Sequence, residues 1–96
     1  MINGVVYTET YKTTLTAVIN NVESAYRVSS GEKLLNRIDR IVEKIISNPY
    51  LYQAIPVDPR FRRAVISSQS SLVYEITETR IILLYIFDNR PNPFWV

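Results

Sequence analysis

The stretch "SLVYEITETRIILLYIFDNRPNP", Ser71–Pro93, carries the pattern that decides the fold class. In its first part, Leu72, Tyr74 and Ile76 alternate with Val73, Glu75 and Thr77. This period of two is typical of a β-strand. After the turn "TETR", the run "IILLYIF" is apolar on both faces, as in a central strand. We therefore expect two antiparallel strands here, preceded by another strand around Phe61–Ile66.

Further upstream the apolar period becomes helical, and two stripes predict two helices. Thr8 or Thr10 is placed to cap the first helix. Ser29 and Glu32 have the spacing of a capping box for the second helix, and Pro49 ends it. The stripes consist of Tyr11, Leu15, Val18, Ile19, Val22 and Tyr26, and of Leu34, Leu35, Ile38, Ile41, Val42, Ile45 and Ile46.

A short apolar strand, about Ile2–Tyr7, comes before the helices, and three prolines indicate an irregular segment over residues 49–60. The expected order is strand, helix, helix, strand, strand, strand. This is an α+β fold in a single domain over residues 1–96, with the helical hairpin packed on one face of an antiparallel sheet. We expect a shared core that includes Ile38, Ile45, Tyr74 and Leu84.

Composition restricts the chemistry that the chain can perform. The 96 residues include no Cys and no His, which removes thiolate chemistry, the usual zinc ligands and the commonest general base. We expect no cofactor and no metal. The net charge of +2 is a mild bias toward acidic partners. With no signal peptide pattern and no long apolar run, the expected location is cytoplasmic, with no membrane partner.

The element order, together with "FRR" at residues 61–63, "SLVYEI" at 71–76 and the ending "IILLYIFDNRPNP", resembles the RelE/ParE superfamily. Its members are bacterial toxins of type II toxin-antitoxin modules, and the likeness is to those called plasmid-stabilisation proteins. The resemblance covers nearly the whole chain. It implies a toxin that inhibits growth and is neutralised by a cognate antitoxin.

The resemblance also implies two alternative mechanisms. RelE-type toxins cleave ribosome-bound mRNA by attack of a ribose 2′-hydroxyl on the adjacent phosphate, which requires cations that compensate the developing charge. ParE-type toxins poison DNA gyrase. The expected partners are therefore an antitoxin and either gyrase or the ribosome with its mRNA.

Three arginines are the candidate phosphate or target contacts. Arg62 and Arg63 fall where RelE toxins carry basic residues, and Arg90 matches the arginine that follows the last strand. Plainer interpretations are a charged edge strand for "RFRR" and a pairing with Asp88 for Arg90. The RelE arginine before "LVY" is replaced by Ser71.

The nuclease tyrosine of the RelE branch would fall at the end of this chain, where Phe94, Trp95 and Val96 have no hydroxyl. Together with Ser71, this departure favours the gyrase mechanism over mRNA cleavage. A third hypothesis is a degenerate, non-toxic binding scaffold that keeps the fold, because fold does not fix function.

Overall fold

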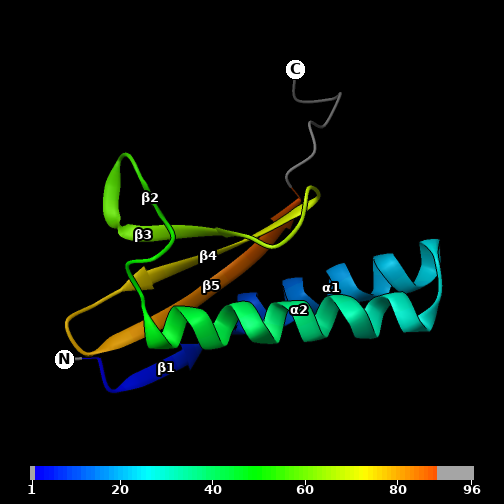
Figure 1. Cartoon of the computed structure of the whole chain (residues 1–96), viewed down its shortest axis with the longest axis horizontal. Helices are drawn as coiled ribbons and strands as arrows, with labels where there is room; N and C mark the ends of the chain where they lie inside the picture. The colour runs from blue at the N-terminus through cyan, green and yellow to red at the C-terminus, as the bar shows by residue number, and fades with distance from the viewer. Residues whose placement is uncertain (1, 89–96) are drawn as a thin grey trace.

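Two helices and five strands make up the computed structural model of the protein, which describes residues 2–88 (Figure 1). The elements follow one another as a strand, a helical hairpin and four further strands. They are β1 Gly4–Tyr7, α1 Glu9–Ala25, α2 Val28–Ser47, β2 Gln53–Ile55, β3 Asp58–Val65, β4 Ser70–Ile76 and β5 Arg80–Asp88. Neither helix is long and apolar enough to cross a membrane.

The five strands form one sheet in the order β1-β5-β4-β3-β2. The meander predicted from the alternation is confirmed, because β3 pairs antiparallel with β4 and β4 pairs antiparallel with β5. β1 lies parallel to β5 at one edge of the sheet, and β2 lies at the opposite edge. The hairpin of α1 and α2 connects these two edge strands and covers one face of the sheet.

The short strand β2 was not predicted. It lies within the proline-containing segment that we expected to be irregular, and it pairs antiparallel with β3 through Gln53↔Arg63 and Ala54↔Arg62. The pairing shifts register after Ala54, so the ladder is too short and too interrupted to leave an alternating pattern in the sequence. Its presence makes β3 an inner strand, and the interpretation of "RFRR" as a charged edge is therefore wrong.

The helix starts agree with one prediction and contradict another. The hydroxyl of Thr8 accepts a hydrogen bond from the backbone N–H of Tyr11, so Thr8 caps α1, and the same hydroxyl donates to Leu83 in β5. The predicted capping box of Ser29 and Glu32 is wrong, because α2 already begins at Val28. Its N-cap is Arg27, which makes no side-chain capping bond.

The core lies between the helical hairpin and one face of the sheet. Ile38 and Ile45 from α2 pack there with Tyr74, all three fully buried as predicted. The prediction for Leu84 is wrong: it is only half-buried and lines a recess on the other face, while its neighbour Leu83 occupies the core. The cause is a register shift between β4 and β5 that no periodicity reveals: Val73 pairs with Tyr85, whereas Tyr74 pairs with Leu83.

Candidate functional site

The face of the sheet that points away from the helices, here called the open face, carries the candidate site. Alternation along the strands places Arg63, Val65, Ser71, Val73 and Phe87 on it. Val73 is only 3% exposed, yet it belongs to no part of the helix-side core cluster, because side chains of the open face cover it. The open face therefore has a small apolar layer of its own.

Arg63 is the cation at the centre of this face. Its Nε donates a 3.1 Å hydrogen bond to the hydroxyl of Ser71, and its guanidinium carbon lies 5.5 Å from the centre of the Phe87 ring. Phe87 in turn packs edge-on against Tyr85, with ring centres 6.1 Å apart. These contacts fix one side of the guanidinium while the residue stays exposed at the surface of the open face.

Arg62 lies on the opposite side of β3 and has a different environment. It donates from Nε to the carbonyl of Pro59 and from Nη1 to the carbonyl of Tyr52, each at 3.1 Å. Its guanidinium carbon also lies 5.2 Å from the centre of the Tyr50 ring. Two consecutive strand residues point to opposite faces, so the structure does not bring Arg62 and Arg63 together in one cationic site.

The contacts of Arg62 hold the loop between α2 and β2 in place. Pro49 belongs to the same loop, and its carbonyl accepts a 2.6 Å hydrogen bond from the hydroxyl of Tyr74 in β4. We interpret Arg62 as a residue that positions this loop, whereas Arg63 is exposed on the open face.

A recess of about 360 Å³ lies beside Arg63 on the open face, toward the β2–β3 hairpin. Its lining is mostly apolar, and Asp58 at its rim forms a 2.7 Å ion pair with Arg60. Hydrogen bonds from Arg60 lower the pKa of Asp58, which keeps this carboxylate ionised. The lining residues are Ile55, Val57, Asp58, Phe61, Val73, Leu84 and Tyr85.

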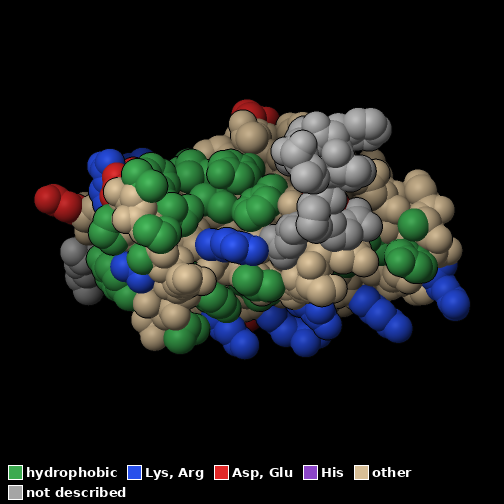
Figure 2. All heavy atoms as spheres, turned by 90° about the horizontal axis from the view of Figure 1, so that it is seen from above, with side chains coloured by type: hydrophobic (Ala, Val, Ile, Leu, Met, Phe, Trp, Pro, Cys, Tyr) green, Lys and Arg blue, Asp and Glu red, His purple; other side chains and the backbone are tan. Residues whose placement is uncertain are grey.

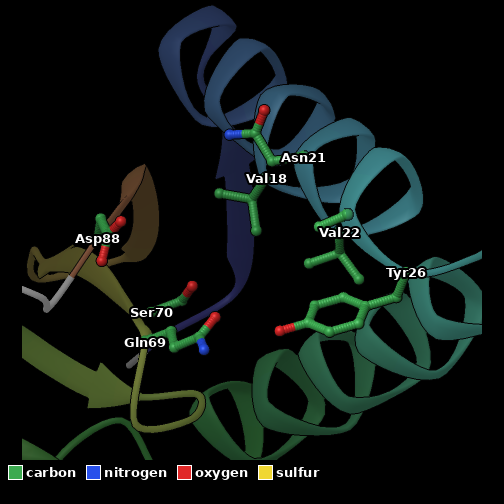
Figure 3. A pocket seen from close by; sticks show the side chains of 8 residues that line it. Val18, Asn21, Val22, Tyr26, Gln69, Ser70 and Asp88 are labelled. Atoms are coloured by element: carbon green, nitrogen blue, oxygen red, sulfur yellow. The ribbon is translucent and has the colours of Figure 1, made fainter.

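A second pocket, of about 120 Å³, opens between the end of α1 and the start of β4 (Figure 3). Val18 and Val22 form its apolar wall, and the ring of Tyr26 points across it toward Gln69 and Ser70. Asp88, the last described residue, stands at its rim. Arg90 and the terminal Phe94, Trp95 and Val96 lie outside the described residues.

The two tyrosines with a strongly raised pKa, Tyr11 and Tyr74, both owe the shift to about 12 mainly to burial. Both belong to the core on the helix side of the sheet. Residues 2–88 also contain no cluster of three or more His, Cys, Asp or Glu side chains suited to a metal ion. What the open face offers is a fixed guanidinium beside aromatic and aliphatic surface.

Sequence reasoning named Arg63 as a candidate contact, which stays a prediction, and it missed the groups that hold this side chain. Ser71 is fully buried beneath Arg63 and accepts its hydrogen bond, whereas the sequence suggested only a lost arginine at that position. Phe87 was seen only as part of an apolar run. Phe87 lies opposite Ser71 in the ladder between β4 and β5, and the sequence of either strand does not record that pairing.

Comparison with known proteins identifies the fold. No family model matches the chain, and no curated protein is similar to it in sequence. Among solved structures, a chain of the chromosomal ParDE TA system from P. aeruginosa has a TM-score of 0.77 at 15% identity, covering 94% of this chain and 98% of that one. YafQ in the E. coli DinJ-YafQ toxin-antitoxin complex has a TM-score of 0.66 at 12% identity, with coverage of 92% and 93%.

A copper-bound mutant toxin from Helicobacter pylori is also similar, with a TM-score of 0.58 at 18% identity and coverage of 93% and 96%. At such identities the likeness is one of fold, and it extends over almost the full length of each chain. The protein has the RelE/ParE-like fold that the sequence resemblance implied.

Proposed function

We propose that this protein is the toxin of a type II toxin-antitoxin module. The observation that carries the proposal is the full-length match of fold to chains of such modules, with 94% of this chain and 98% of the ParDE chain superposed. A cognate antitoxin, as in the DinJ-YafQ complex, would then be the protein's natural partner.

We further propose that the toxin acts by binding a protein target, with DNA gyrase favoured over the ribosome. The residues of the open face support this choice. Arg63 is present and fixed, but Ser71 replaces a guanidinium of the nuclease branch, and the two tyrosines with a strongly raised pKa lie in the core on the helix side of the sheet instead of on this face. Cleavage of a phosphodiester requires both charge compensation and proton transfer, whereas binding requires neither.

The experiment is induction of the chain alone in a bacterium that carries no matching antitoxin. We expect growth to stop, with induction of the DNA damage response and with no early arrest of translation. Primer extension on mRNA should show no cuts in the ribosomal A site. The control is the same gene interrupted by an early stop codon.

Other outcomes separate the alternatives. A-site cuts in mRNA after induction would replace gyrase poisoning by the RelE-type reaction. Unimpaired growth, with the protein shown to be folded and abundant, would support the non-toxic scaffold. Co-expression of a small protein encoded beside this gene should restore growth if that protein is the antitoxin.

A further inference from the structure

The outward surface of α2 sorts its charges by sign. Lys33, Arg37, Arg40 and Lys44 follow one another at steps of four, three and four residues, so they share one flank of the helix, here called the basic stripe. All four are exposed. Figure 2 shows Lys and Arg side chains along its lower edge, which is the side that faces the viewer in Figure 1 and along which α2 runs.

The acidic residues of α2 lie on a different flank. At 3.6 residues per turn, the basic stripe occupies a sector of about 60°, and the acidic residues occupy a separate sector of about 40°. The acidic residues are Glu32, Asp39 and Glu43. Within residues 2–88, no residue of the basic stripe forms an ion pair, because the recorded pairs join Lys12 to Glu9 and Arg60 to Asp58.

This segregation has a cost for the isolated protein. Two like-charged pairs at spacing i, i+4 arise within the stripe, Lys33 with Arg37 and Arg40 with Lys44, and such pairs destabilise a helix. A helix whose charges served only solubility would gain by mixing the signs. A polyanion bound along the stripe would remove the repulsion and supply the missing partners.

We propose that the basic stripe binds the phosphate backbone of double-stranded DNA without reading its sequence. The stripe spans 12 residues of helix, whose ends lie about 16 Å apart, and over such a length duplex DNA presents one phosphate charge per roughly 1.7 Å. Other atoms of the protein help to orient Arg37, because its Nη1 lies 3.5 Å from the carbonyl oxygen of Ile66, the residue that follows β3.

Two features of the stripe favour duplex DNA over other polyanions. No aromatic residue stands in α2, and single-stranded nucleic acids are usually held by stacking on such rings. The exposed large apolar residues of α2, Val28, Leu35 and Ile46, lie on the acidic side of the helix. An acidic amphipathic peptide would therefore find no apolar contact at the stripe, whereas a phosphate backbone needs none.

Fluorescence anisotropy with a labelled 20-base-pair DNA duplex tests the proposal, using the purified full chain over a range of salt concentrations. Four phosphate contacts predict that log affinity falls with log salt at a slope of about −3.6. The double variant Arg40→Gln, Lys44→Gln should make the slope shallower by about 1.8. The matched control Lys12→Gln, Arg80→Gln also lowers the net charge from +2 to 0 but should leave the slope unchanged.

Several results would overturn the proposal. Equal losses in the two double variants would mean that only net charge matters. An unchanged slope in Arg40→Gln, Lys44→Gln, with circular dichroism showing an intact fold, would exclude the stripe. Competition by poly-glutamate at equal charge concentration, or tighter binding of a duplex RNA of the same sequence, would point to another ligand. Growth is not a readout here, so failure of this proposal is distinct from failure of the toxin proposal.

Discussion

At the scale of single residues, the hydroxyl of Tyr74 makes a hydrogen bond whose contribution to stability can be measured. Its ring is fully buried in the core, and its hydroxyl donates to the carbonyl of Pro49 at 2.6 Å. Tyr74→Phe keeps the packing and removes only this bond, so we expect a loss of about 1 kcal/mol in the free energy of unfolding. Urea denaturation measures the loss. Tyr85→Phe, at a residue that is 39% exposed, is the control and should cost almost nothing.

The same residue, with Tyr11, predicts how stability depends on alkaline pH. Burial raises the pKa of both hydroxyls from 10.0 to about 12 in the folded protein. Both tyrosines are neutral in either state below pH 10, so their contribution to stability is complete there. As pH rises from 10 to 12 the unfolded chain ionises first, and stability falls.

Urea denaturation at pH 8 and at several values from pH 10 to 12 tests this pH dependence. The double variant Tyr11→Phe, Tyr74→Phe should lose stability less steeply over that interval than the natural chain. An equally steep loss in the variant would assign the alkaline transition to other groups.

Individual side chains also mark the limit of prediction from sequence. The roles of the adjacent Arg62 and Arg63 could not be separated, because their different partners come from the loop after α2 and from β4 and β5. The same limit applies to Ser71. Ser71 is fully buried, so the guanidinium of Ser71→Arg would have to displace the neighbouring Arg63 and Phe87. We therefore expect this change to destabilise the fold rather than add a functional cation.

At the scale of elements, α2 packs on the sheet, and two neighbouring isoleucines on this helix provide a matched test of which side of it is buried. Ile45 is fully buried, whereas Ile46 is 44% exposed on the other side of the helix. Ile45→Ala should lower the free energy of unfolding by roughly 2 to 5 kcal/mol. Ile46→Ala removes the same atoms from a surface position and should cost about 0.5 kcal/mol or less. Similar losses in both, measured in urea, would contradict the observed orientation of α2 against the sheet.

The elements with strong periodic signals were predictable from the sequence, and those set by pairing were not. The apolar residues of α2 recur at the helical period and those of β4 alternate, and these patterns identified both elements, because burial on one face of an element makes its apolar residues recur at regular intervals. β2 and the shift that moves Leu84 out of the core depend on which strand lies alongside, and the sequence of one segment does not record its neighbour.

At the scale of the whole molecule, the fold separates three surfaces by chemistry. The helix-side core supplies stability, the open face presents Arg63 with aromatic neighbours, and α2 presents the basic stripe to solvent. Each of the three lies on a different part of the molecule, so a substitution in one should leave the other two largely unchanged.

The adjacent arginines of β3 test this separation in cells. Arg63→Ala removes an exposed cation from the open face, so growth inhibition by the induced protein should be lost or much weakened, while the lost hydrogen bond to Ser71 should lower the free energy of unfolding by about 1 kcal/mol. Arg62→Ala breaks one hydrogen bond to Tyr52 in the loop after α2 and one to Pro59 within β3, and it should lower stability by about 1 to 3 kcal/mol, while the open face keeps its guanidinium. Its toxicity, compared at equal amounts of folded protein, should persist. Full toxicity of Arg63→Ala would remove the open face from the target contact.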